Sequence, residues 1–190
     1  MKTLFNTKNI IRLLAVLLIT FTVISCQRDG SVAEDDLPQE ELTNIILLVK
    51  EDTPGATAIE YNYSIGAGGV PTIPLKDGKS YTVEAKFRNG NEDATQEIID
   101  AKNEHFLIFD FPKSNITVTR LDGGDLRNDG KRVGLKTKWD VTQAVGGTAP
   151  FLKLTLIHEP QSVNDAKAGT AWGSVVGGET DAEATYNLSN

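Results

Sequence analysis

The chain has 190 residues, of which 39% are hydrophobic and 24% charged, which is enough apolar material for one ordinary domain and excludes wholesale disorder or a multidomain assembly. Its formal net charge of -7 argues against a nucleic-acid-binding protein, because neutralising phosphates requires a clustered basic surface.

Residues 1–25 have the layout of a secretory leader, in which basic residues without any acidic one precede an apolar run over residues 13–24. The run is shorter than the about 20 apolar residues that a bilayer-spanning helix needs, so a permanent membrane span is disfavoured. It ends in Val23-Ile24-Ser25-Cys26, which resembles the bacterial lipobox, where two aliphatic positions and a small residue precede a cysteine that is lipidated. We therefore predict a lipoprotein signal peptide over residues 1–25.

Cys26 is the only cysteine of the chain and is the predicted lipidation site, the alternative being an incidental thiol in an ordinary leader. Lipidation would leave no thiol for disulfides, thiolate zinc sites or cysteine catalysis. Several acyl chains together anchor a protein stably, because each buried CH₂ contributes about 0.8 kcal/mol. We therefore expect a domain anchored to an outer membrane, on either its periplasmic or its surface face.

A polar, acidic segment follows the lipidation site. Residues 27–41 read QRDGSVAEDDLPQEE, which is typical of a solvated linker. We predict an acidic flexible tether over residues 26–42 and a single folded domain over residues 43–190. Acidic residues near the lipidated cysteine loosely resemble the signals that send Bacteroidota lipoproteins to the outer face of the outer membrane.

The folded part shows strand patterns and almost none of the apolar spacing of helices. Eight strands are expected, over residues 44–50, 58–66, 80–88, 104–111, 115–120, 134–141, 151–158 and 182–188. Gly-rich turns lie between them, and one short amphipathic helix is expected over residues 94–102. This pattern predicts an all-β, immunoglobulin-like β-sandwich, with a small β-barrel as the alternative.

Two histidines form the most informative constellation. Alternation places His105 on the core face at the beginning of its strand and His158 on the core face at the end of its strand. If the two strands are antiparallel neighbours, or face each other across the sandwich, the two imidazoles can meet at one edge of the core. The neighbouring Glu104 and Glu159 are expected to point to the opposite face.

Two interpretations of the histidines remain open. Either they cap the core as hydrogen-bonded rim residues, or His105 and His158 are ligands for zinc or copper, with a third ligand from an unidentified loop carboxylate. Thiolate and methionine ligands are unavailable to such a site after the leader is removed.

Other motifs give weaker signals. The Asp-rich residues 122–130 lack the spacing of a calcium-binding EF-hand loop, so a solvated hairpin loop is expected there, and an acidic turn at residues 177–181. Trp172 is a candidate ligand contact, the alternative being local packing. The Gly-x-Ser-x-Gly elbow and the phosphate loop are both missing from the sequence, and with no catalytic motif found no enzyme is predicted.

Several short motifs carry a resemblance to known proteins. They are Cys26, the acidic tether, Asn103-Glu104-His105-Phe106, the run over residues 133–139, the run over residues 156–160, and Gly178-Glu179-Thr180-Asp181. With them the chain resembles a group of small Bacteroidota lipoproteins, often described only as hypothetical or periplasmic-binding-like proteins, some of which accompany TonB-dependent outer-membrane receptors. The resemblance favours metal handling or a role as a receptor accessory.

Taken together, the sequence favours a non-enzymatic, lipid-anchored outer-membrane binding or accessory module that captures a metal or small ligand beside a TonB-dependent transporter. The alternative is a structural or protein-interaction surface lipoprotein that binds no small ligand. A hydrolase with an unrecognised acidic site is a third hypothesis.

Overall fold

The computed structural model describes residues 42–124 and 126–190, so the predicted signal peptide, the lipidation of Cys26 and most of the predicted tether lie outside the described residues. The helix in this part of the chain is α2 (Thr95–Asp100), and no helix among the described residues is long and apolar enough to cross a bilayer. The described strands are β1 (Asn44–Glu51), β2 (Ile59–Ser64), β3 (Thr72–Pro74), β4 (Ser80–Asn89), β5 (Glu92–Asp93), β6 (His105–Asp110), β7 (Asn115–Arg120), β8 (Lys136–Gln143), β9 (Phe151–His158), β10 (Ser162–Ala168), β11 (Ala171–Val176) and β12 (Glu179–Ser189).

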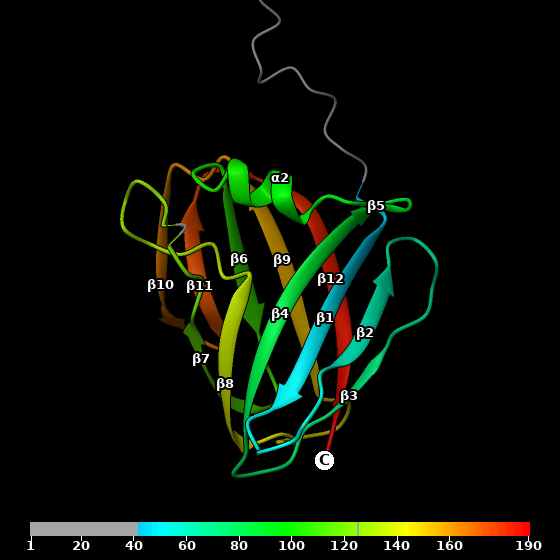
Figure 1. The fold of residues 1–190 in the computed structure, drawn as a ribbon. Coiled ribbons are helices and arrows are strands. Elements are labelled where there is room, and N and C mark those ends of the chain that lie inside the picture. Colours follow the sequence, from blue (N-terminus) through cyan, green and yellow to red (C-terminus); the bar gives the residue numbers. More distant parts are fainter. Residues whose placement is uncertain (1–41, 125) are drawn as a thin grey trace, which may run out of the picture. The chain divides into compact units, whose positions relative to one another are not determined.

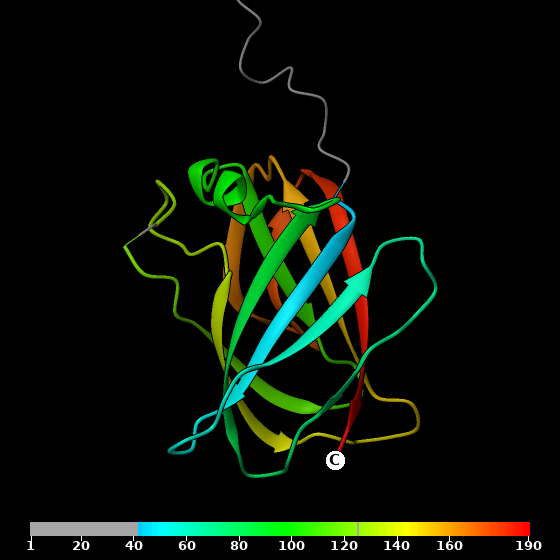
Figure 2. The ribbon, with the colours of Figure 1, turned by 45° about the vertical axis from the view of Figure 1, so that its right-hand side comes forward.

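These strands form two six-stranded sheets. Sheet A has the order β2-β1-β4-β8-β7, with β5 added to β4, and sheet B has the order β10-β11-β6-β9-β12-β3. Figures 1 and 2 show the two sheets face to face, with α2 across one open end. The sheets are not closed into the small barrel that was the alternative, so the predicted all-β sandwich is confirmed.

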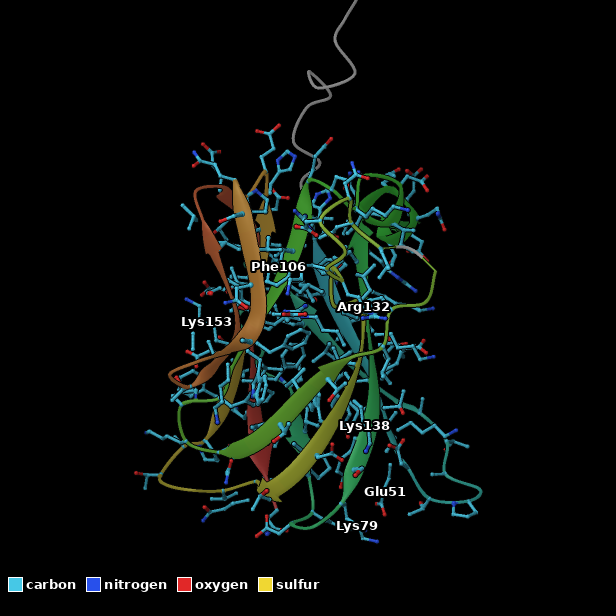
Figure 3. All side chains as sticks on the ribbon, turned by 90° about the vertical axis from the view of Figure 1, so that its left-hand side faces the viewer. Glu51, Lys79, Phe106, Arg132, Lys138 and Lys153 are labelled. Carbon is cyan, nitrogen blue, oxygen red and sulfur yellow. The ribbon has the colours of Figure 1, made fainter. Side chains whose placement is uncertain are left out.

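Strand alternation builds the core between the sheets. In β4 every second side chain is buried, and the same holds for the central part of β9 and for β12 from Ala182 onward. Trp139 of β8 is fully buried, and Phe109 and Phe111 meet its ring edge-on. In Figure 3, Glu51 and Lys79 mark the end of the sandwich opposite α2.

Each of the eight expected strands coincides with an observed one, with small shifts at its ends, and the expected helix is present but shorter. Four observed strands, β3, β5, β10 and β11, were not predicted. β10 reads SVNDAKA and is mostly exposed, so its sequence carries no apolar alternation.

Sheet B opens between β6 and β11, and Arg120 fills the opening. β11 pairs with β6 only through Ala171 and Trp172. Beyond them, the Arg120 guanidinium donates to the carbonyls of Val133 (2.7 Å) and Leu107 (2.6 Å). Burial lowers the pKa of this guanidinium to about 10, while the charges of Asp122 and Asp165 act in the opposite direction. The whole residue is only half-buried, but its charged end is enclosed and replaces missing backbone pairing.

The Asp-rich loop connects the antiparallel strands β7 and β8, and most of its described residues are exposed, as expected for a solvated hairpin loop over residues 122–130, but Arg127 is buried and ties the loop to the protein. Arg127 is only 7% exposed and donates to the carbonyls of Lys102 (3.1 Å) and His105 (2.9 Å). Asp122 accepts backbone N–H groups of the segment leading into β8, and Asp129 pairs with Arg127. These carboxylates therefore shape the loop instead of surrounding a cation.

Candidate functional site

The two histidines meet at the α2 end of the sandwich. β6 and β9 are antiparallel neighbours, and His105 and His158 are direct register partners. Their rings stack with centroids 5.1 Å apart and an interplanar angle of 13°. Of the two arrangements that would let the imidazoles meet, the structure has antiparallel neighbours within one sheet.

Asp181 joins the histidines through a β-bulge. Thr180 pairs with Ile157 and Ala182 pairs with Leu156, so Asp181 is an extra residue of β12 that has no partner in the β9 register. The bulge brings its carboxylate to one nitrogen of each ring, with Oδ2 3.3 Å from His105 Nε2 and Oδ1 3.6 Å from His158 Nδ1. Sequence reasoning assigned this residue to an acidic turn and missed its role.

Glu104 also reaches the site, contrary to the expectation that it faces away. Its Oε2 lies 3.8 Å from His158 Nε2. Glu104 precedes β6 and belongs to the turn after α2, so strand alternation does not govern its direction. We call His105, His158, Asp181 and Glu104 the rim cluster.

His105 is held in one orientation by the turn after α2. Its Nδ1 lies 3.0 Å from the carbonyl oxygen of Ala101, and Arg127 holds the carbonyl of His105 itself. Because a carbonyl only accepts, this bond requires the proton on Nδ1, which leaves Nε2 directed toward Asp181. A backbone acceptor on one ring nitrogen is the support that metal-binding imidazoles usually have.

A hollow of about 240 Å³ opens beside the rim cluster, lined by His158, Glu159, Gly178 and Glu179. A Cβ at Gly178 would lie 2.6 Å from the carbonyl oxygen of His158, so only glycine fits this wall. Glu159 and Glu179 are exposed here, next to Asp181 and Glu104. The surroundings of the imidazoles are therefore rich in carboxylates, which suits a cationic ligand.

The rim cluster is not arranged as a metal chelate. Within residues 42–124 and 126–190, no three His, Cys, Asp or Glu side chains stand in a geometry that holds a metal ion. The stacked rings present their nitrogens side by side, whereas zinc requires ligand nitrogens converging at about 2.0–2.1 Å from the ion. Chelation by His105, His158 and Asp181 thus requires a rotation of His158, whose side chain is 30% exposed against 13% for His105.

The geometry of Trp172 favours local packing over ligand contact. Its indole N–H donates to the carbonyl of Ile116 in β7 (2.8 Å), and its ring packs against the core. Lys167 lies 5.5 Å from the ring centroid. Trp172 therefore ties β11 of sheet B to the edge of sheet A.

Comparisons of the chain with protein-family models, curated proteins and solved structures give no match.

Proposed function

We propose that the chain is a lipid-anchored, non-enzymatic binding module of a bacterial outer membrane that captures a divalent transition-metal ion at the rim cluster. The observation that carries this proposal is the convergence of His105, His158 and Asp181 from three neighbouring strands. The Asp181 carboxylate oxygens lie 3.3 Å from a nitrogen of His105 and 3.6 Å from a nitrogen of His158. Imidazole and carboxylate together are a ligand set that suits zinc or copper.

The rim cluster combines two fixed ligands with one adjustable ligand. His105 is fixed by the Ala101 carbonyl, and Asp181 is fixed by the bulge and is nearly buried. His158 ends β9 and borders the hollow, so a rotation of its ring requires no rearrangement of the core. The ion would then replace the contacts that Asp181 makes with the two imidazoles.

The surrounding charge supports capture of a cation. Glu104 lies beside His158, and Glu159 and Glu179 border the same hollow. Carboxylates around an open site raise the local concentration of cations and increase their rate of association.

Calorimetric titration with Zn²⁺ tests the proposal on residues 27–190, which contain every described strand together with its pairing partners. The parent should bind one ion per chain with a Kd in the micromolar range or tighter. His105→Gln, His158→Gln and Asp181→Asn should each weaken binding about 10-fold or more. Glu60→Gln, which removes a charge from the exposed face of β2, is the matched control and should bind like the parent.

Two results would overturn the metal proposal. In the first, the titration shows no saturable heat of zinc binding although the protein is folded, as its cooperative unfolding would show. In the second, Glu60→Gln weakens zinc binding as much as Asp181→Asn does. Either result leaves the rim cluster as a hydrogen-bonded cap of the core and favours the protein-interaction lipoprotein.

Anchoring and partners are a separate part of the proposal, supported by the lipobox at Cys26 and by the resemblance to lipoproteins that accompany TonB-dependent receptors. Expression of the full chain with an alkyne-labelled fatty acid should label the parent and leave Cys26→Ser unlabelled. Affinity purification of the labelled protein from outer membranes should recover a TonB-dependent receptor. An unlabelled parent overturns the anchor, and recovery without such a receptor overturns the partner.

A further inference from the structure

A groove lies between α2 and the segment that leads into β8. The N–H of Ala85 in β4 still bonds to the carbonyl of Leu135 (2.7 Å), but the N–H of Phe87 bonds instead to the hydroxyl of Thr95 in α2 (3.0 Å). Upstream of Leu135 the chain crosses to sheet B, where the carbonyl of Val133 bonds to β6. Figure 1 shows β4 continuing past β8 toward α2. The groove occupies the space left where β8 departs.

The groove has an apolar interior of about 270 Å³, just below the about 300–1,000 Å³ of typical ligand pockets. Its apolar lining consists of Ala85, Ile99, Val133 and Leu135. Helix α2 buries Ile98 in the core but leaves the next residue, Ile99, half-buried at the groove. Ile99 is therefore an apolar side chain of α2 that lies at the groove and outside the core.

The charged rim of the groove is mostly basic, although the chain as a whole is acidic. Its charged residues are three lysines and two carboxylates, namely Lys86, Lys102, Lys136, Glu84 and Asp122. Both oxygens of Asp122 accept backbone N–H groups, and Glu84 pairs with Lys136 at 2.7 Å. The charges of Glu84 and Lys136 thus offset each other and Asp122 is engaged by backbone N–H groups, so the positive charge of the mouth comes mainly from the exposed Lys86, on which Asp93 also acts.

We propose that this groove binds a small amphiphilic carboxylate, with its apolar body against Ile99 and Leu135 and its carboxylate beside Lys86. An apolar interior with a positive mouth complements a molecule that is apolar at one end and anionic at the other. The small volume limits the apolar body to a short chain or a single ring. This site is separate from the rim cluster and does not depend on metal binding.

Sodium octanoate, titrated into ¹⁵N-labelled residues 27–190 and followed by amide chemical shifts, tests the proposal. Saturable shifts should appear in residues 95–102 and 121–136. Acetate, which lacks the apolar body, and 1-octanol, which lacks the charge, should each bind at least 10-fold more weakly. Lys86→Glu and Ile99→Asp should each weaken octanoate binding about 10-fold, since one reverses the charge at the mouth and the other places a carboxylate in the apolar wall.

Matched controls come from the same sheet. Lys50→Glu reverses an exposed charge on β1, and Ile59→Asp replaces an exposed apolar residue on β2, so both should bind octanoate like the parent. The proposal is overturned if octanoate shifts no amides of the groove, if 1-octanol binds equally well, or if the control variants weaken binding as much as Lys86→Glu.

Discussion

Asp181 reaches His105 because β12 contains one residue more than its partner β9 at this point. In a regular strand each residue of β12 would have a partner in β9, and Asp181 would take its direction from strand alternation. The extra residue frees Asp181 from this pairing, so that its carboxylate contacts both imidazoles. The bulge is thus the local feature that converts two neighbouring histidines into a three-residue cluster.

The packing of Arg120 in the opening between β6 and β11 requires a glycine at position 173. Gly173 has φ of +101°, and a Cβ there would lie 2.7 Å from Arg120 Nη2 and 2.9 Å from Phe106 Cε1. Gly173→Ala should lower the free energy of unfolding by about 3 kcal/mol, from backbone strain and from overpacking together. Urea denaturation checks this, with Gly55→Ala as the control, since Gly55 has φ of +79° and nothing within 4 Å of its Cβ position. An equal loss in both variants would refute the packing argument.

The guanidinium of Arg120 should not be replaceable by an ammonium group. Lysine cannot reach both carbonyls with the same planar fork, so Arg120→Lys loses at least one of two charge-assisted hydrogen bonds in an enclosed site. The expected loss is about 2–4 kcal/mol in the free energy of unfolding. Arg88→Lys on the exposed face of β4 should change stability by less than about 0.5 kcal/mol. Similar values for the two variants would contradict the structural role of Arg120.

Tyr186 links the two sheets, since its buried hydroxyl donates to the carbonyl of Ile45 (2.7 Å). Tyr186→Phe should lose about 1–2 kcal/mol of stability at pH 8. Burial raises the pKa of Tyr186 above the ordinary value of 10.0, so above that pH the unfolded chain loses its proton first and the parent loses stability. The difference between parent and Tyr186→Phe should therefore shrink as the pH rises above about 10. Urea midpoints at pH 8 and pH 10.8 measure it, and a constant difference would count against the raised pKa.

Arg127 is a positioning residue for the rim cluster, because it holds the carbonyl of His105 and touches none of the proposed ligands' donor atoms. Arg127→Lys should weaken zinc binding about 10-fold. A variant that only loses stability would keep the parent's Kd under conditions where it is fully folded. Calorimetry at a temperature well below the unfolding midpoint separates the two results.

From the sequence, each histidine could be assigned to a face and to a strand end, because apolar residues alternate over much of both strands, but whether the two imidazoles meet stayed open, since the pairing of β6 with β9 could not be read from the sequence. The sequence did not predict the position of Asp181, since a bulge appears only once β9 and β12 are paired. Glu104 was assigned to the wrong face because the strand begins one residue later than expected. β10 was missed because an exposed polar strand has no apolar pattern, and with it the opening that Arg120 fills.

X-ray absorption at the zinc edge, on the one-to-one complex of residues 27–190, shows directly whether the rim cluster binds the ion. We expect two imidazole nitrogens at about 2.0–2.1 Å and one carboxylate oxygen at about 2.0–2.2 Å from the zinc ion, with one nitrogen lost in His105→Gln and one in His158→Gln. A coordination shell of oxygen atoms alone, or one unchanged by both substitutions, would contradict it.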